Sequence, residues 1–413
     1  MVKDEGPGIE VPLPHADAPA APPRLLTTRP FLWLVLADGT AGLGRWGFFL
    51  AVVGDATYRL QATPGQVALL LAAFSLPFIV ASPVHGILAD RWSAKWLLVI
   101  TVGLSAAVAA IPLATDSLTA LYGASALFGL LHSSLTPGRG ALVPRLVPQD
   151  RLVQANGMIS GALSLQLIIG PSLAAALVRL IGPDAPYVVT LAATALSVAL
   201  FLVVPDRRGP ATTRSSLFGD AAAGFLEAWR TDDLRRVFVL AVSVWLLIGL
   251  LISLEPSYIR ESLGRSQAFL GTVWAVYGAG ELAGSVALSR VRGAGREISL
   301  VALGLLVAAA GFLIYVSVPV PAAVIAGNVV FGFGFPFFTA TSQALIQRVA
   351  REPGQVSAAF SMTGEMGPVV AAAILIAVGD RIAVRPLLLS AGVVFTVVAL
   401  AALRTARRVR AAA

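Results

Sequence analysis

The chain has 413 residues, of which 57% are hydrophobic and only 13% are charged. This composition excludes an ordinary soluble globular fold, which needs more polar surface, and indicates a membrane protein. The net charge of +8 does not indicate nucleic-acid binding, because most of the Arg and Lys residues stand in short segments between apolar runs rather than together.

The first 30 residues contain seven prolines and little that could pack into a core. No continuous apolar stretch of about 7–15 residues precedes Arg24, so a signal peptide is not expected. We predict a disordered cytoplasmic tail here.

Twelve apolar runs follow this tail. At about 1.5 Å per residue, a helix of roughly 20 residues crosses a hydrocarbon core about 30 Å thick. We therefore predict an all-α membrane protein whose twelve transmembrane helices lie at 31–53, 66–85, 97–115, 118–141, 157–179, 187–204, 236–256, 268–288, 298–317, 322–345, 356–378 and 385–404.

The basic residues predict the orientation of these helices. If the N-terminus is cytoplasmic, 23 of the 30 Lys and Arg residues fall in cytoplasmic segments, and six fall outside, at Arg59, Arg179, Arg260, Arg265, Arg381 and Arg385. Cytoplasmic loops carry the excess of basic residues in membrane proteins. We therefore expect a multi-pass protein of the cytoplasmic (inner) membrane that has both termini in the cytoplasm and acts as a monomer.

The first span contains two charged residues, Asp38 and Arg45. They are two helical turns apart, on one face and about 10 Å from each other. An ionisable group in mid-membrane costs about 2.5–3.5 kcal/mol, so it usually faces a cavity or a partner. We interpret Asp38 either as a proton carrier or as part of a static ion pair with Arg45 or another arginine. Arg45 is a candidate cavity residue.

The segment Gly86–Lys95 separates the second and third apolar runs and carries three charges, at Asp90, Arg91 and Lys95. Two runs of membrane-spanning length flank it. We predict that these ten residues form a tight turn.

Further polar residues inside the spans are candidates for the cavity. His132 is either a packed, hydrogen-bonded residue or a ligand or relay group. Glu255 is either an outer gate group or a helix-end charge beside Pro256. The other cavity candidates are Gln166, Glu281, Asn328 and Gln343.

Glu365 lies near the midpoint of the eleventh span, beside Gly364 and Gly367. We expect this helix to line the cavity. Glu365 is therefore the second candidate for proton coupling, with a static structural role as the alternative.

The longest internal segment between spans is 205–235, and it divides the chain into halves of six spans. Phe218, Phe225 and Trp229 recur there at helical spacing, which predicts an amphipathic helix, with a plain linker as the alternative. The predicted domains are a tail at 1–30, a six-helix bundle at 31–204, a cytoplasmic linker at 205–235, a second six-helix bundle at 236–404 and a cytoplasmic tail at 405–413.

The two halves repeat each other. The segment 141–147 matches 344–350, and Gly170-Pro171 matches Gly367-Pro368. Two matches in the same order at nearly the same period indicate a duplicated six-helix unit, which is how many secondary transporters are built.

The pattern Gly86-x-Leu88-x-Asp90-Arg91-x-x-x-Lys95, placed after the second of twelve spans, resembles the signature of the major facilitator superfamily. The resemblance covers about residues 31–404 and implies two pseudo-symmetric six-helix bundles. It also implies that this loop latches the cytoplasmic gate, with its aspartate meeting the N-terminal end of the eleventh helix. Alternatively, Arg91 and Lys95 only fix the topology.

The pattern Gly161-x8-Gly170-Pro171 resembles the fifth helix of exporters in that superfamily. Small residues permit close helix approach, and proline removes one backbone hydrogen bond, so the segment would act as a hinge or seal. Gly367 and Pro368 repeat it in the eleventh span. A simple packing kink is the alternative.

Two features indicate which branch of the superfamily the chain resembles. The arginine that proton-coupled drug exporters often carry in the fourth helix is absent, because Ser125 stands four residues before Gly129. The run from Pro137 to Pro148, followed by Ala155-Asn156, resembles the enterobactin-exporter and macrolide-efflux branch.

These observations predict a secondary active transporter, specifically a proton-coupled exporter of a small amphipathic organic molecule such as a drug, a siderophore or a secondary metabolite. A lipid or lysophospholipid flippase of the same fold is one alternative, and a non-transporting membrane sensor or scaffold is another. An enzyme is not expected, because the chain has no cysteine, three histidines and neither a phosphate-binding loop nor a His-Glu-x-x-His motif. We expect no cofactor and no metal, with the proton gradient as the energy source.

Overall fold

The computed structural model describes residues 29–148, 152–206, 217–291, 297–378 and 383–412, and this part of the chain is helical with short connections. The α-helices are α1 (Arg29–Gly54), α2 (Pro64–Arg91), α3 (Ala94–Ala110), α4 (Leu118–His132), α5 (Leu135–Leu146), α6 (Leu152–Ile181), α7 (Ala185–Val203), α8 (Leu217–Arg230), α9 (Asp232–Glu261), α10 (Gln267–Ser289), α11 (Glu297–Ser317), α12 (Pro321–Val349), α13 (Pro353–Val378) and α14 (Val384–Ala412). A π-helix, η2 (Asp55–Arg59), extends α1, and a 3-10 turn, η3 (Ile111–Ala114), extends α3.

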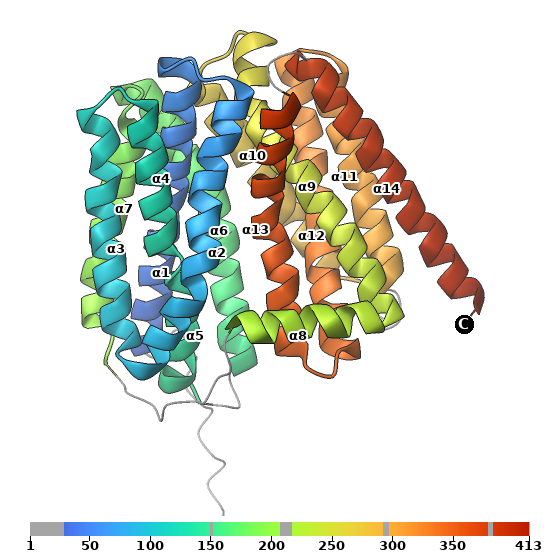
Figure 1. The fold of residues 1–413 in the computed structure, drawn as a ribbon, viewed down its shortest axis with the longest axis horizontal. Helices are drawn as coiled ribbons and strands as arrows, with labels where there is room; N and C mark the ends of the chain where they lie inside the picture. The colour runs from blue at the N-terminus through green and yellow to red at the C-terminus, as the bar shows by residue number, and fades with distance from the viewer. Residues whose placement is uncertain (1–28, 149–151, 207–216, 292–296, 379–382, 413) are drawn as a thin grey trace, which may run out of the picture.

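The helices form two groups that stand side by side (Figure 1). Helices α1 to α7 make the first group, α9 to α14 make the second, and α8 lies across one end of the bundle. Helix α1 begins and α14 ends at that same end, which we call the termini side. The opposite end is called the far side. The sequence-based expectation of an all-helical membrane protein is confirmed.

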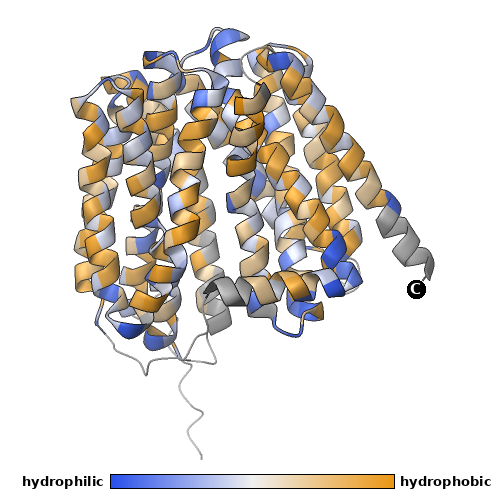
Figure 2. Ribbon diagram, in the orientation of Figure 1, coloured by the Kyte–Doolittle hydropathy of each residue, from blue (hydrophilic) through white to orange (hydrophobic). Residues whose placement is uncertain are grey.

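In the described part of the chain, nine helical stretches are both long and apolar enough to cross a membrane. The α4–α5 pair counts there as one stretch, Leu118–Leu146. The other long helices, α1, α6 and α10, run along the bundle as well and complete the twelve predicted helical paths. Figure 2 shows that apolar residues cover the long helices, while polar residues gather at the two ends.

Two predicted boundaries are wrong. The segment Gly86–Lys95 is not a turn along its length, because α2 continues through Arg91 and the turn is confined to Trp92 and Ser93. Ile87, Leu88 and Ala89 support helix there, and the Ser93 side chain caps α3 by accepting a hydrogen bond from the Trp96 backbone N–H.

The fourth predicted span is likewise not one helix, because it breaks at Ser133 and Ser134. Pro137 has no N–H to offer the Ser133 carbonyl one turn earlier, which explains the position of the break.

The ends of the chain extend beyond the predicted spans. The disordered tail predicted at 1–30 lies outside the described residues, apart from Arg29 and Pro30, which begin α1. At the other end, α14 continues to Ala412, so residues 405–412 of the predicted tail are helical. Their Ala and Arg content favours helix.

The buried core shows where the two groups meet. One buried cluster joins far-side residues of the first group, such as Phe48 and Leu70, to residues of the second group, such as Leu254 and Leu270. A separate cluster around Phe31 belongs to the termini side of the first group. The two groups are therefore packed together mainly toward the far side.

Candidate functional site: a charged cluster between the helix groups

Asp38 lies in an ion pair inside the first group. Its Oδ2 atom accepts a hydrogen bond from Nη1 of Arg139 at 2.8 Å, and the Asp38 side chain is only 4% exposed. The predicted ion pair with an arginine is thus present, and the arginine is Arg139 of α5 rather than Arg45.

The break between α4 and α5 is held by two buried hydrogen bonds. Nδ1 of His85 lies 2.8 Å from Oγ of Ser133, and Oγ1 of Thr101 lies 2.6 Å from Oγ of Ser134. Helices α2 and α3 therefore fix the bend from which α5 directs Arg139 toward α1.

Gln166 of α6 secures the same part of α1. Its Nε2 atom donates to the Asp38 carbonyl oxygen at 3.2 Å. This approach needs a glycine at position 42, because a Cβ atom there would lie 1.6 Å from Oε1 of Gln166. Gln166 is therefore a structural hydrogen-bond donor to the backbone of α1 and is 4% exposed.

Arg45 stands between two carboxylates that belong to different groups of helices. Its guanidinium lies 5.2 Å from the ring centre of Trp46 and interacts electrostatically with Glu365 of α13 and with Asp38. Arg45 and Glu365 are both half-buried. The sequence-based candidates Asp38, Arg45 and Glu365 are thus brought into one cluster, which we call the charged cluster together with Arg139.

His132 borders the charged cluster from α4. Its ring stacks on Phe128 with centroids 4.5 Å apart, and its Nε2 atom lies 3.4 Å from the Ala41 carbonyl oxygen. That geometry calls for a proton on Nε2, so Nδ1 is the unprotonated nitrogen of the neutral ring, and among the described residues it has no hydrogen-bond partner. His132 also interacts electrostatically with Arg45.

Aromatic rings close the bundle on the far side of the charged cluster. Trp274 of α10 lies 6.3 Å from Trp46 and 5.2 Å from Phe49, both of α1, between ring centroids. The indole Nε1 of Trp274 donates to Oε2 of Glu255 at 2.6 Å, and the Tyr315 hydroxyl donates to Oε1 at 3.0 Å. Glu255 is therefore a buried carboxylate with two hydrogen-bond donors, behind a seal to which both groups contribute.

Hydrogen bonds between the groups reinforce this closure. Gln267 donates to the Leu50 carbonyl at 3.3 Å, and Arg179 donates to Thr272 at 3.1 Å. Arg260 of α9 donates to the carbonyl of Thr57 in η2. The described structure is thus closed at the far side.

A second charged network lies beyond α1, in η2. Asp55 is 1% exposed, pairs with Arg59 at 2.6 Å and accepts a hydrogen bond from the Tyr187 hydroxyl at 2.9 Å. Arg59 also pairs with Asp116 at 2.7 Å. Burial raises the pKa of the Asp55 carboxyl, against the hydrogen bond from Tyr187 and the charge of Arg59, which both lower it.

The remaining cavity candidates lie within the second group. Asn328 donates to the Val273 carbonyl at 2.9 Å and so joins α12 to α10. Gln343 accepts a hydrogen bond from Ser357 at 3.0 Å and joins α12 to α13. Glu281 of α10 has a buried Oε2 atom without a hydrogen-bond partner among the described residues.

The signature segment lies at the termini side. Gly86, Asp90 and Arg91 belong to the last turns of α2, and the side chain of Asp90 lies outside the described set. Lys95 donates to the Leu202 carbonyl at 2.7 Å, and Ser93 donates to Asp206 at 2.7 Å. Ser93 and Lys95 therefore contact the end of α7 and the residues that follow it, within the first group.

The Gly-Pro pairs lie at close helix contacts. A Cβ atom on Gly170 would lie 2.7 Å from the Trp46 Cβ, and one on Gly367 would lie 2.3 Å from the Trp245 carbonyl oxygen. Each half thus places a tryptophan of its first helix against the glycine of its Gly-Pro pair. Pro171 and Pro368 lie inside α6 and α13, and Gly161 lies in α6 as well.

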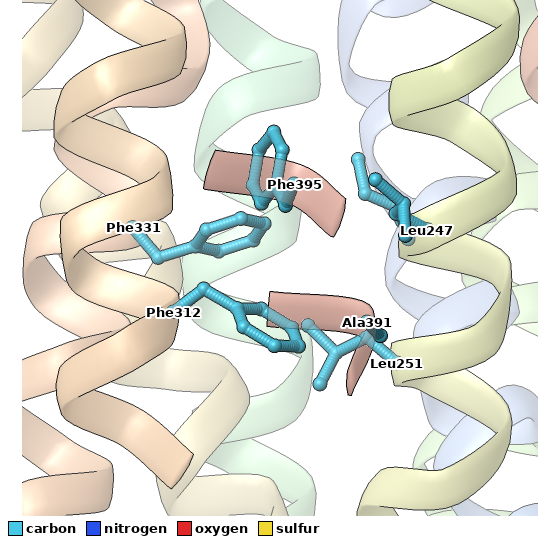
Figure 3. A pocket seen from close by; sticks show the side chains of 7 residues that line it. Leu247, Leu251, Phe312, Phe331, Ala391 and Phe395 are labelled. Carbon is cyan, nitrogen blue, oxygen red and sulfur yellow. The ribbon is translucent and has the colours of Figure 1, made fainter. Parts of the chain in front are cut away.

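A small apolar gap lies inside the second group, away from the charged cluster. It is lined by Leu247, Ile248, Leu251, Phe312, Phe331, Ala391 and Phe395 (Figure 3). The space between its atoms amounts to about 180 Å³ but has no room for a water molecule. It is a packing gap between four helices rather than a ligand site. Among the described residues, no group of His, Cys, Asp and Glu side chains could hold a metal ion.

Comparisons with known proteins identify relatives. The family model described as Major Facilitator Superfamily matches residues 34–372. The chain is 28% identical over 294 residues to the uncharacterized MFS-type transporter y4rN of Sinorhizobium fredii, which covers 69% of this chain and 72% of the relative. It is 26% identical over 184 residues to the uncharacterized MFS-type transporter YfiS of Bacillus subtilis, 44% of each chain.

Solved structures of transporters share the fold. A POT family transporter in complex with 5-aminolevulinic acid matches with a TM-score of 0.74 and 11% identity, over 92% of this chain and 97% of that one. The nucleoside transporter NupG matches with a TM-score of 0.69 and 14% identity, over 92% and 98%. At such identities the likeness concerns the fold.

Proposed function

The chain belongs to the major facilitator superfamily and is therefore a secondary transporter rather than an enzyme, and we propose that it exports a small amphipathic organic molecule in exchange for protons. The exchange would proceed by alternating access, in which the two helix groups open the cavity to one side of the membrane at a time. The substrate class, the direction and the coupling ion are the parts that we propose here.

The observation that carries the proposal is the position of Arg45. It interacts electrostatically with Asp38 on its own helix and with Glu365 on α13 of the other group. One cation thus has an acidic partner in each group. Such an arrangement can link the protonation of a carboxylate to the distance between the groups.

The physical basis of this link is the attraction between opposite charges in a medium of low polarity. Ionised Glu365 attracts Arg45 and favours the approach of the two groups around the cluster. A proton on Glu365 removes that attraction, while Asp38 remains held by Arg139 at 2.8 Å. We propose that Glu365 carries the proton that releases the groups, and that Asp38 exchanges protons when the Arg139 contact opens.

Aromatic side chains beside the charged cluster support an amphipathic cargo. Trp46, Phe49 and Trp274 lie on the far side of the cluster, and Trp245, whose ring packs on Gly364, lies next to Glu365. Rings offer apolar surface, whereas the carboxylates and arginines offer polar contacts. A molecule with both kinds of surface fits this environment.

We propose that the termini side is the cytoplasmic side of the inner membrane, because basic residues are concentrated there. The described structure would then be the inward-facing state. In the outward-facing state, Asp90 would latch the N-terminal end of α13, and Asp90→Ala would loosen that latch. We also propose the enterobactin-exporter and macrolide-efflux branch, on the run Pro137–Pro148.

The test of the proposal is the double variant Asp38→Asn with Glu365→Gln in proteoliposomes. We expect the wild type to accumulate the cationic dye ethidium against its gradient when a proton gradient is imposed, and we expect the variant to bind ethidium without accumulating it. The control changes two exposed far-side carboxylates, by Asp116→Asn with Glu261→Gln, and should accumulate ethidium normally. Proton-driven accumulation by the double variant would remove both residues from the coupling mechanism.

A further inference from the structure

We propose that the second group recognises a protonated amine or another organic cation on its cargo, through Glu281 at one end of a row of aromatic rings. The row consists of Tyr277, Phe335 and Trp245, and we call it, with Glu281, the aromatic wall. This inference deepens the proposed function, on which it rests, by naming the chemical class of the cargo.

The aromatic wall is continuous across three helices. Tyr277 of α10 lies 6.1 Å from Phe335 of α12, and Phe335 lies 5.5 Å from Trp245 of α9, between ring centroids. All three side chains are half-buried, so each ring keeps part of its surface accessible. Part of the ring surface of the wall is therefore available for contact with a ligand.

Unpartnered polar atoms of opposite kinds lie at the two ends of the row. Glu281 stands one helical turn after Tyr277 and interacts electrostatically with it. Oε2 of Glu281 and Nε1 of Trp245 are both buried and have no hydrogen-bond partner among the described residues. A buried polar atom without a partner is destabilising, so both atoms favour a ligand that supplies the missing contact.

The charge of Glu281 decides which ligand fits. Glu281 takes part in none of the ion pairs between described residues. By contrast, Asp38 has Arg139, and Glu365 has the charge of Arg45 nearby. A cation beside Glu281 would supply the opposite charge and would also interact favourably with the ring faces.

The Glu281 carboxylate, the ring surfaces and the Trp245 N–H together define the ligand that fits the wall. A cationic group binds at Glu281, an aromatic or aliphatic body lies along the rings, and a hydrogen-bond acceptor meets the indole N–H of Trp245. An anionic molecule of the same shape lacks the first contact and is repelled by the carboxylate. The wall therefore selects by charge and, at its other end, by an acceptor.

The first experiment compares two ions of nearly the same shape and opposite charge, tetraphenylphosphonium and tetraphenylborate, by titration calorimetry on the purified full chain in detergent. We expect Glu281→Gln to weaken tetraphenylphosphonium binding about tenfold or more and to leave tetraphenylborate binding the same or stronger. The matched control is Glu261→Gln, which removes the same charge from an exposed position at the far side, 47% exposed. This control should leave binding of both ions unchanged.

The second experiment tests the other end of the wall with Trp245→Phe, which keeps an aromatic ring and removes the N–H. Rhodamine 6G is a cation with an ester carbonyl, whereas tetraphenylphosphonium has no acceptor. We expect Trp245→Phe to weaken rhodamine 6G binding several-fold and tetraphenylphosphonium binding much less. Equal losses for the two cations would overturn the role of the N–H.

The outcomes separate this inference from the proposed function. Wild-type protein that binds neither cation, or a Glu281→Gln variant that binds tetraphenylphosphonium as the wild type does, overturns the inference. Cation binding that depends on Glu281, without proton-driven accumulation in proteoliposomes, leaves the inference in place and overturns proton-coupled export.

Discussion

In the first half of the chain, Trp46 of α1 packs against Gly170 of one Gly-Pro pair, and in the second half Trp245 of α9 packs against Gly367 of the other. The residue before the tryptophan is Arg45 in the first half and Val244 in the second. The backbone contact is repeated, and the side-chain chemistry beside it is not. The duplicated unit thus preserves the close helix packing while the two inner surfaces have diverged.

The divergence extends through each group. The first group surrounds its contact with charged and hydrogen-bonding residues, including the Asp38–Arg139 pair. The second group fills the corresponding region with rings, among them Phe312, Phe331 and Phe335. A hydrogen-bonded charge network has strict geometry, whereas aromatic contacts are less directional and tolerate small shifts. Apart from Glu365, the charged cluster thus belongs to the first group, whereas the second group offers mainly ring surface.

Of the variants that test this contrast, Phe331→Ala is expected to lower the stability of the protein most. Phe331 is 5% exposed, and its ring lies 5.7 to 6.4 Å from those of Tyr277, Phe312, Phe335 and Phe395. Loss of a buried Phe side chain costs about 3–5 kcal/mol. We expect a large drop in the thermal midpoint in detergent.

A matched control for that variant is Val329→Ala on the same helix, since Val329 is 39% exposed. It should change the midpoint little. If Phe331→Ala were tolerated as well as Val329→Ala, the rings would not be what holds the second group together.

In the first group, Arg139→Ala is the corresponding change. It leaves the carboxylate of Asp38, 4% exposed, without its ion-pair partner. Breaking a buried pair from one side costs about 3 kcal/mol. We expect a lower thermal midpoint that is partly restored in the double variant with Asp38→Asn, because the amide carries no charge to leave unpaired.

Additivity of the two changes would contradict this account. If Arg139→Ala and Asp38→Asn each lower stability and the double variant shows the sum of both losses, the two side chains do not stabilise each other. The contrast between a charged first group and an aromatic second group would then rest on Arg45 alone.

Much of the fold follows from the sequence because the bilayer imposes a simple rule. Apolar runs of about 20 residues locate the helical paths, and the charged Asp38, Arg45 and Glu365 stand out because ionisable residues are rare inside spans. Local signals also explain the break between α4 and α5, since Pro137 cannot bond to Ser133. We did not predict that break, because the apolar run continues across it.

The partners of the site residues could not be predicted in the same way. Arg139 lies 101 positions from Asp38, and the contact depends on how α5 is directed by His85 and Thr101 of other helices. One signal was available, since residue 139 falls inside the fourth predicted span, where an ionisable side chain needs a partner. The donors of Glu255, Trp274 and Tyr315, come from two further helices, and no local pattern pairs them.

A smaller change tests how tightly the charged cluster is held. Gly42→Ala would place a methyl group where Gln166 reaches the Asp38 carbonyl, with Oε1 of Gln166 at 1.6 Å from the new Cβ. Because the obstructing atom ends a flexible side chain, Gln166 should shift and lose its hydrogen bond, at a cost of about 1 kcal/mol.

Gly39→Ala is the control in the same helix, where a Cβ atom meets nothing within 4 Å. Alanine favours helix over glycine by about 1 kcal/mol at both positions. Gly39→Ala should therefore raise the thermal midpoint, whereas in Gly42→Ala the lost hydrogen bond offsets that gain and the midpoint should change little. An equal rise in both variants would mean that the Gln166 contact does not stabilise α1.

The smallest effect on stability is expected at Asp55, a carboxylate at the far side of the first group. Burial raises its pKa above the ordinary value of 3.8, so the folded protein holds this proton more tightly than the unfolded chain does. The stability contributed by that proton is fully present below pH 3.8 and is lost as pH rises through the raised pKa of the folded state.

Asp55→Asn is neutral at every pH and keeps an oxygen that can accept a hydrogen bond from Tyr187. We therefore expect the stability of the wild type relative to Asp55→Asn to fall with rising pH, in thermal midpoints measured from pH 4 to pH 8. Asp116→Asn, at a side chain 77% exposed, should show no such trend. A difference that grows with pH would mean that the ion pair with Arg59 outweighs burial, and the first group would then gain stability from its charges at the far side as well as at the cluster.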